Sequence, residues 1–317
     1  MKFIKKSILF FLSRIPLLEV IIKKIYWNSN FLIDYKNNSR KKKIDIKQKD
    51  INVLIDTLDI INFNSSDVLV LHSSYGDIKS HFQIHEGPKE IIDILEKKIG
   101  PNGTLAIPTH PLYSTKPIDK SYMRHDDTES ITTYDVKNTK AWTGAIANTF
   151  LSLNGVLRSA HPINSIAAKG KYAYEMICNN LMGEYPKANG VNSSWNFCVK
   201  HNAIILGLGV DLVHSLTIIH VAEDTDESRF PNDKWYYLRK FRILQNGNDT
   251  EIVVRERKHK WAIYYAERSL KRDLIKANIL KEIDIDGFAI EYIQDSSLLM
   301  SYLKKRGGFY PYRGVRK

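Results

Sequence analysis

Two short apolar runs, separated by one helical pattern, constrain the fold of this chain more than any other feature. Residues 67–71 and 104–107 are rich in Val, Leu and Ile, as buried strands are. Between them, residues 89–99 place their apolar side chains at helical spacing, and Pro101-Asn102-Gly103 is a turn. A strand, a helix and a second strand within about 40 residues form the crossover that joins parallel strands. The sequence therefore predicts an open α/β sheet.

The same alternation continues along the chain and predicts a three-layer α/β/α domain with a largely parallel central sheet. Further helices are expected at 51–58, 144–153 and 172–181, and a further buried strand at 203–208. Residues 111–140 are polar and irregular, which is typical of a substrate-facing loop.

Later segments predict a smaller β-rich part. Residues 232–265 form a β-rich insertion with a hairpin turn at 245–248, and the tail from residue 270 is expected to be mostly helical. We divide the chain into a basic amphipathic segment and linker, 1–50, and one catalytic domain, 51–317, that contains the insertion.

Four motifs follow or contain the predicted strands. His72-Ser73-Ser74 follows the first strand, and Thr109 follows the second after the run Gly103 to Pro108. The other two each combine an apolar run with a histidine. The third motif is Arg158-Ser159-Ala160-His161-Pro162, with Ser165 after it, and the fourth runs from Gly207-Leu208-Gly209 to Thr217, His220 and Glu223.

These motifs, in this order, resemble those of the aminoglycoside 3-N-acetyltransferase family. The resemblance covers roughly residues 50–230 and includes Thr143-Gly144 before an apolar helix. It implies acetyl-CoA as co-substrate and coenzyme contacts around His72 to Ser74 and around Arg158 to Ser165.

The chemistry of acetyl transfer to an amine assigns roles to these residues. The ammonium group of the acceptor must lose a proton before it attacks, and a neutral histidine suits this task. The resemblance makes His161 the base, while His220 and Glu223, three residues apart, share a helical face and can orient one another. The expected catalytic residues are therefore His161, His220 and Glu223.

The binding residues follow from the same reasoning. Coenzyme contacts are expected from Ser73, Ser74 and Thr109, because ligands of open α/β sheets bind near the strand ends. The resemblance implies further coenzyme contacts from His72, Arg158, Ser159 and Ser165. Acceptor contacts are expected from Asp126 and Asp127 in the polar loop and from Glu223. A serine after a strand is also a common helix N-cap, so that reading stays open for Ser73 and Ser74.

One motif departs from the family pattern. Many members have Gly-Glu-Gly-Ser-Pro where this chain has Gly190-Val191-Asn192-Ser193-Ser194. The missing carboxylate weakens the case for an antibiotic substrate, and both Glu223 and Glu184 are candidates to replace it. No nucleophile elbow, phosphate-binding loop or zinc-ligand spacing is present, so neither a common α/β-hydrolase nor a metal site is expected.

The net charge and the composition of the N-terminal segment indicate which partners the chain could bind. The chain of 317 residues has a net charge of +12, with basic blocks at both ends, which favours an anionic partner. No nucleic-acid-binding motif accompanies the charge. Residues 1–27 mix Lys and Arg with Ile, Leu, Phe and Trp, and the longest apolar run is shorter than the roughly 20 residues that span a bilayer. This pattern fits an interfacial membrane helix, and it also fits ordinary packing or an oligomer contact.

The sequence thus predicts an acetyl-CoA-dependent N-acetyltransferase that acts on a primary amine of an amino sugar or aminoglycoside, with no metal. Two cysteines without a disulfide pattern favour a cytoplasmic location, with peripheral membrane contact through residues 1–27 and a homo-oligomer both left open. The alternative from another class is a non-catalytic scaffold protein of surface polysaccharide assembly on the same fold.

Overall fold

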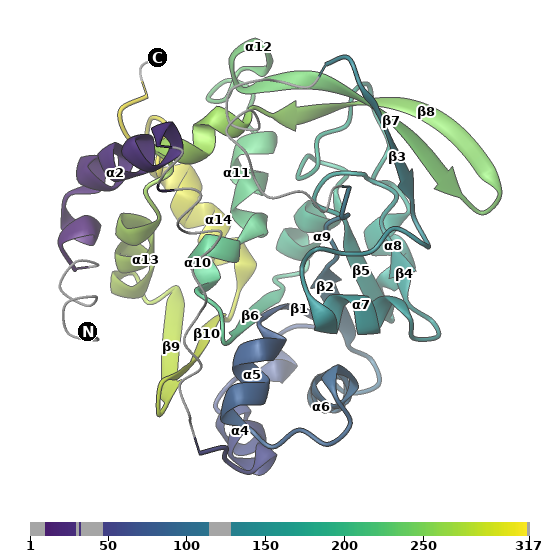
Figure 1. Cartoon of the computed structure of the whole chain (residues 1–317), viewed down its shortest axis with the longest axis vertical. Helices are drawn as coiled ribbons and strands as arrows, with labels where there is room; N and C mark the ends of the chain where they lie inside the picture. Colours follow the sequence, from purple (N-terminus) through teal and green to yellow (C-terminus); the bar gives the residue numbers. More distant parts are fainter. Residues whose placement is uncertain (1–9, 30–31, 33–46, 114–127, 316–317) are drawn as a thin grey trace.

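A seven-stranded sheet forms the centre of the computed structural model, which describes residues 10–29, 32, 47–113 and 128–315 (Figure 1). The strand order is β4-β5-β2-β1-β6-β10-β9. The strands are β1 (Val68–Ser73), β2 (Thr104–Pro108), β4 (Leu157–Arg158), β5 (Ile166–Gly170), β6 (Ile204–Leu208), β9 (Leu280–Ile285) and β10 (Phe288–Ile293). β1 pairs in parallel with both β2 and β6, while the flanking pairs are antiparallel. The α/β class is confirmed, and the sheet is less parallel toward its edges than the sequence predicts.

Helices cover both faces of this sheet, as the three-layer prediction requires. Alternate residues of β1 enter opposite cores, because successive side chains of a strand point to opposite faces: Leu69 packs with the helices on one face, and Val70 with those on the other. One face carries α4 (Ile51–Leu58), α5 (Tyr75–His81), α6 (Pro88–Ile99) and α7 (Ala145–Leu151). The other carries α8 (Ala173–Ile177), α9 (Ser194–Lys200), α10 (Leu212–Ser215), α13 (Glu267–Lys276) and α14 (Ser296–Lys305).

The predicted hairpin forms a separate three-stranded sheet. β7 (Tyr236–Gln245) and β8 (Asn248–Arg257) are antiparallel and joined by Asn246 and Gly247, both at positive φ, as a tight hairpin turn requires. β3 (Ile131–Asp135) pairs in parallel with β7, so part of the segment expected to be irregular is a strand. In Figure 1 the long hairpin projects from the upper right of the molecule.

The C-terminal region differs from its prediction. Between α13 and α14 the chain forms β9 and β10, which extend the central sheet at its edge. The expectation of a mostly helical tail is therefore wrong for residues 280–293. Asp286 and Gly287, both at positive φ, make the turn between the two strands, and this short Asp-Gly signal is a hairpin marker.

Helix α2 (Pro16–Asn28) begins with a proline, which is favourable in a first helical turn. It packs against the 3-10 helix η4 (His259–Tyr264) and against α13. Among the described residues, no helix is both long and apolar enough to cross a bilayer.

The central strand makes a direct test of this core. Leu69 in β1 is fully buried, and Leu298 on α14 is 57% exposed. We expect Leu69→Ala to lower the free energy of unfolding by about 2–5 kcal/mol, because it leaves a cavity between sheet and helices. The matched control Leu298→Ala should change it by less than about 0.5 kcal/mol. Urea denaturation followed by circular dichroism measures both, and equal effects would contradict the layer assignment.

Candidate active site

A cavity of about 500 Å³ lies where the central sheet meets the small sheet. Its lining combines the ends of β1 and β2 with the segment from Val210 to His220 and with the end of β8. Among the described residues, five histidines line it, namely His72, His110, His214, His220 and His259. The parallel centre of the sheet explains its position, because side chains at the carboxyl ends of neighbouring parallel strands lie at one edge.

One histidine of the lining is bound to a buried carboxylate. His220 ends the 3-10 helix η3 (Thr217–His220), and Glu223 lies in the following α11 (Val221–Asp224). The Nδ1 atom of His220 is 3.0 Å from Glu223 Oε1, so the predicted pairing of these residues is present. The helix places them on one face, three residues apart. The carboxylate orients the imidazole ring and leaves Nε2 as its second functional nitrogen.

The carboxylate of Glu223 is held by two residues that lie far away in the sequence. Arg257 at the end of β8 approaches Glu223 Oε2 to 2.9 Å, and the Tyr312 hydroxyl donates to Oε1 at 2.9 Å. Burial by itself would raise the pKa of Glu223, but Arg257 and His220 outweigh it and lower the pKa to about 2. Glu223 is therefore ionised at neutral pH. The guanidinium of Arg257 also contacts His220 Nδ1.

Two further histidines of the cavity are neutral. His72 on β1 is buried and His110 just after β2 is partly buried in the cavity wall, and desolvation there lowers their pKa values to about 4 and about 3. Nearby positive charge adds to the effect at His110. Within the described part of the chain, neither Nε2 atom has a hydrogen-bond partner. Trp195 lies 6.3 Å from the His72 ring and 6.4 Å from the His110 ring, between centroids.

Comparison with known proteins identifies the family of this chain. The family model described as aminoglycoside 3-N-acetyltransferase matches residues 70–299, a span that contains every motif described above. The chain belongs to the aminoglycoside 3-N-acetyltransferase family. This result confirms the resemblance inferred from the motifs and makes the protein an acyltransferase by family.

One curated relative of the family matches about half of this chain. Aminoglycoside N(3)-acetyltransferase IV from Salmonella sp is 29% identical over 157 residues, which are 49% of this chain and 51% of that protein. The match thus spans about half the length of the curated relative.

Solved structures of the family share the fold over most of the chain. AAC-IIIb in a binary complex with CoASH has a TM-score of 0.66 at 18% identity and covers 83% of this chain and 98% of its own. AAC-VIa with bound sisomicin has 0.62 at 19%, covering 83% and 100%. The apoenzyme of AAC(3)-IVa has 0.58 at 22%, covering 83% and 91%.

The family histidine of the third motif lies behind the cavity wall. His161 is 2% exposed, and Ile163 and Asn164 line the cavity in its place. Its Nδ1 lies 2.9 Å from the carbonyl oxygen of Ile163, and its Nε2 lies 3.3 Å from that of Pro186. Burial lowers its pKa, so the ring is neutral. Both ring nitrogens face backbone groups, and a catalytic role for His161 stays a prediction.

Arg158, Ser159 and Ser165 of that motif form hydrogen bonds to segments that lie far away in the sequence. Arg158 donates to the carbonyl oxygens of Val136 and Thr109, at 3.2 and 2.6 Å. Ser159 and Ser165 both bond Tyr134, whose hydroxyl donates to the Ser159 carbonyl at 2.9 Å and lies 3.0 Å from Ser165 Oγ. None of these three motif side chains lines the cavity, and their coenzyme contacts stay predictions.

The hydroxyl groups near the strand ends differ from one another. Ser73 lines the cavity, whereas Ser74 is the N-cap of α5 and accepts from the Asp77 backbone N–H at 3.3 Å. Thr109 is fully buried, and its Oγ1 has no partner among the described residues. The capping alternative thus describes Ser74.

The remaining residues predicted for the site either lie outside the described residues or do not line the cavity. Asp126 and Asp127 fall outside the described residues. The turn that replaces the family's acidic motif caps α9, since Ser193 Oγ accepts from the Asn196 backbone N–H at 3.1 Å, and Val191 is exposed. Glu184 is exposed and does not line the cavity. Of the two carboxylates that could replace the missing one, only Glu223 bonds a cavity histidine.

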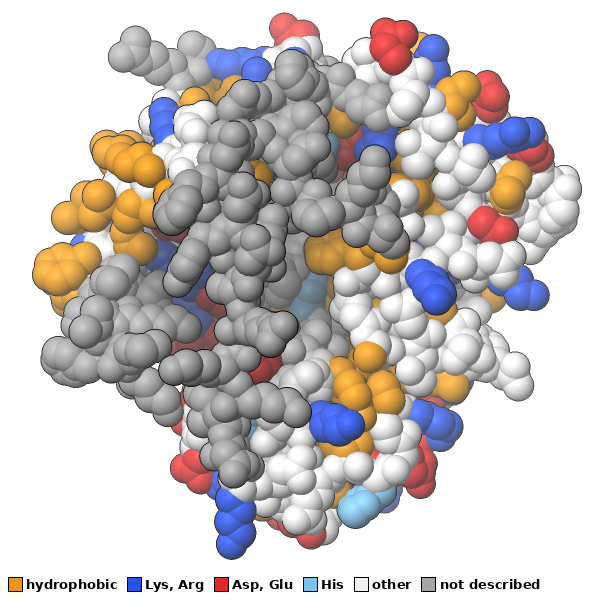
Figure 2. Space-filling model, viewed as in Figure 1, with side chains coloured by type: hydrophobic (Ala, Val, Ile, Leu, Met, Phe, Trp, Pro, Cys, Tyr) orange, Lys and Arg blue, Asp and Glu red, His pale blue; other side chains and the backbone are white. Residues whose placement is uncertain are grey.

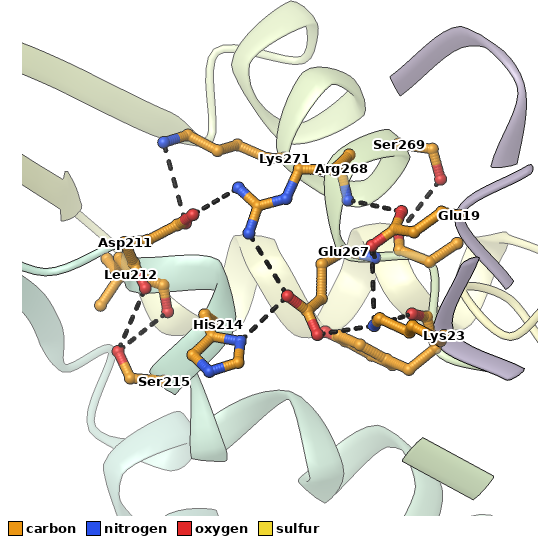
Figure 3. A network of polar contacts seen from close by, with 12 residues as sticks. Glu19, Lys23, Asp211, Leu212, His214, Ser215, Glu267, Arg268, Ser269 and Lys271 are labelled. Carbon is orange, nitrogen blue, oxygen red and sulfur yellow. Dashed lines mark hydrogen bonds and ion pairs between the residues drawn. The ribbon is translucent and has the colours of Figure 1, made fainter. Parts of the chain in front are cut away.

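Sequence reasoning missed a second histidine–carboxylate pair at the edge of the cavity. His214 Nδ1 lies 3.0 Å from Glu267 Oε2, and Lys23 of α2 binds the other oxygen of Glu267 at 2.7 Å (Figure 3). Burial would raise the pKa of Glu267, but His214 and Lys23 lower it to about 2, and the same contact raises the pKa of His214. The partners come from three distant segments, so no local pattern could have predicted them. His110 had a local signal, since it directly follows Thr109.

The described residues hold no group of three or more His, Cys, Asp or Glu side chains arranged to bind a metal ion.

The buried ion pair predicts how stability depends on pH. The pKa of Glu223 is about 2 in the folded protein and 4.5 in a model compound, so the unfolded chain binds the proton more readily. The stability that Glu223 contributes is full above about pH 4.5 and is lost as the pH falls toward 2. We expect Glu223→Gln to flatten the pH dependence of the unfolding free energy in this window, measured by urea titration. The exposed control Glu184→Gln should keep the wild-type slope, and a wild-type slope in both variants would contradict the ion pair.

Proposed function

We propose that this protein is an acetyl-CoA-dependent N-acetyltransferase that acetylates a primary amine of an amino sugar or aminoglycoside. Family membership supports the reaction class. Relatives with this fold were solved with CoASH and with the aminoglycosides sisomicin and apramycin, which supports both substrates. The observation that carries the proposal is the His220–Glu223 pair, whose histidine lines a cavity large enough for part of a coenzyme and an acceptor, while the carboxylate is buried behind it.

The reaction needs one proton acceptor. The acceptor's ammonium group must lose a proton, and the free amine then attacks the carbonyl carbon of the thioester. The new C–N bond forms, and the nitrogen loses its second proton as the tetrahedral intermediate collapses. The C–S bond breaks, and this proton passes to the leaving sulfur, so that coenzyme A departs as the thiol. His220 is the proposed proton acceptor through Nε2, and Glu223 is a positioning residue that stabilises the imidazolium. Motif position favours His161 for the same task, but its ring nitrogens both face carbonyl oxygens.

The oxyanion of the intermediate needs hydrogen-bond donors. His72 and His110 are suited to donate through Nε2–H, since their low pKa values keep them neutral and too weakly basic to take the proton themselves. Ser73 directly follows His72 in the cavity wall, and Thr109, whose hydroxyl is unpartnered within the described segments, directly precedes His110. Donors and base then line one cavity.

The charges of the cavity fit one anionic and one cationic substrate. Three carboxylates line it, Asp224, Glu256 and Glu267, together with three basic side chains, Arg255, Arg257 and Lys258. Phosphates of a coenzyme favour the basic side chains, and an amino sugar favours the carboxylates. A mixed lining of this kind suits a two-substrate reaction.

Two measurements, coenzyme binding and thiol release, test whether the protein has the proposed activity. We expect acetyl-CoA to bind in calorimetric titration, and thiol release to be observed with at least one member of a panel of aminoglycosides and amino sugars. His220→Ala should lower kcat by about 10²–10⁴-fold, the usual contribution of a general base. His85→Ala, an exposed histidine outside the cavity, is the matched control.

The outcomes separate the alternatives. Loss of activity in His161→Ala with little change in His220→Ala would move the base to the motif histidine. Absence of both coenzyme binding and turnover in the wild-type protein would reject the enzyme and leave the non-catalytic scaffold.

The proposed oxyanion donors have a different kinetic signature. We expect His72→Ala and His110→Ala to lower kcat by about 10²–10³-fold with little change in the KM for acetyl-CoA. The expected reason is that these donors act on charge that develops only in the transition state. Steady-state kinetics over a range of pH measures this. A raised KM with unchanged kcat would instead assign both residues to substrate binding.

A further inference from the structure

Helix α2 is attached to the protein by its polar side. Glu19 is 5% exposed, although a carboxylate on an ordinary amphipathic helix faces solvent. Its two oxygens accept hydrogen bonds from the backbone N–H groups of Glu267 and Arg268, at 3.2 and 3.1 Å, at the start of α13. A carboxylate stabilises the exposed N–H groups at a helix N-terminus, so this contact fixes how α2 is rotated about its axis.

A second polar residue strengthens the same attachment. Lys23, one turn after Glu19, donates to the carbonyl oxygen of Tyr265 at 2.6 Å and to Glu267 at 2.7 Å. Figure 3 shows both side chains pointing from α2 toward Glu267 and Arg268 at the start of α13. Arg268 and Lys271 extend the network to Asp211. The inward face of α2 is therefore held by charge and hydrogen bonds, together with the buried side chain of Val20.

Because Glu19 and Lys23 face inward, the opposite, outward face of α2 carries the apolar side chains. Leu17, Ile21 and Ile25 follow one another at four-residue spacing and are 55%, 52% and 58% exposed. Leu18 and Ile22 lie beside them and are also exposed, as are Ile15, Phe10 and Phe11 just before the helix. In Figure 2 their side chains form the orange cluster at the left edge, over the position of α2 in Figure 1. Soluble monomers rarely expose a contiguous apolar patch of this kind without a partner.

The surroundings of this patch identify the partner. Arg14 and Lys24 are exposed at its margin, and the neighbouring sequence carries Lys5 and Lys6 and a basic run at 40–43 within a chain of net charge +12. Tyr26 and Trp27 stand at the end of the helix. Exposed aliphatic side chains bordered by basic and aromatic residues match the interface of an anionic bilayer, where the apolar side enters the acyl boundary and the cations meet the headgroups.

We propose that the outward face of α2 docks on an anionic lipid surface, with the helix lying in the plane of the interface. With 13 residues, α2 lies on the surface and does not span it. The proposal rests on how α2 is packed and does not depend on the proposed acetyl transfer. Through Lys23, Glu267 and His214, the helix adjoins the cavity wall, so docking places the cavity close to the membrane.

Sedimentation with vesicles tests this without coenzyme or acceptor. The full chain is mixed with vesicles of phosphatidylcholine alone or of phosphatidylcholine with phosphatidylglycerol. We expect binding to the anionic vesicles, weakened by salt and by Arg14→Gln/Lys24→Gln. Leu17→Ser/Ile21→Ser/Ile25→Ser should weaken it at least ~10-fold, because it removes three aliphatic groups that would enter the acyl boundary of the bilayer. These side chains point outward, so the fold should be unchanged by circular dichroism.

The matched control is Ile60→Ser/Leu298→Ser, which removes two exposed aliphatic side chains elsewhere on the surface, 63% and 57% exposed. It should bind vesicles as the wild type does. Equal binding by the wild type and the triple variant would overturn the proposal. So would a wild-type dimer in sedimentation velocity that ignores vesicles and that the triple variant dissociates, since the patch would then be covered by a second copy of the chain.

Discussion

The parallel pairing of β1 with both β2 and β6 is the constraint on which the site depends. The register sets His72 beside Gly207 and Val70 beside Ala106, so the three strands end at one edge. Because strands buried on both faces can hold few polar side chains within the sheet, the polar residues are found where the strands end. His72, Ser73 and His110 lie there, and they form one wall of the cavity.

The second wall depends on a buried ion pair between distant segments. Arg257 ends the hairpin strand β8, and Glu223 lies on α11, which comes after α10 and η3 in the sequence. Neither charge is stable when buried alone, so each side requires the other. The pair attaches the small sheet to the main domain and at the same time orients His220. One interaction therefore serves both stability and the geometry of the proposed base.

Polar contacts between distant segments also attach the N-terminal helix α2 to the rest of the protein. Glu19 and Lys23 satisfy groups on α13 and near η4 that would otherwise be exposed or unpaired. Glu267 receives Lys23 on one oxygen and His214 on the other. The network thus connects α2 to the edge of the cavity, and the rotation of α2 that it imposes turns the apolar side of the helix outward.

The sequence by itself determined the local elements and the family. Apolar runs and helical spacing predicted β1, α6, β2 and the hairpin of β7 and β8, because these signals lie within a few residues of one another. The ordered motifs identified the acetyltransferase family, and the three-residue spacing predicted the His220–Glu223 pair.

The tertiary structure alone decided which side chains reach the cavity. His161, which the resemblance makes the base, and Arg158 do not line the cavity, while Arg257, His214 and Glu267 join the site from segments far along the chain. The antiparallel edge of β9 and β10 and the outward apolar face of α2 were likewise decided by packing. Contacts between distant segments depend on how the layers stack, and no local pattern encodes that.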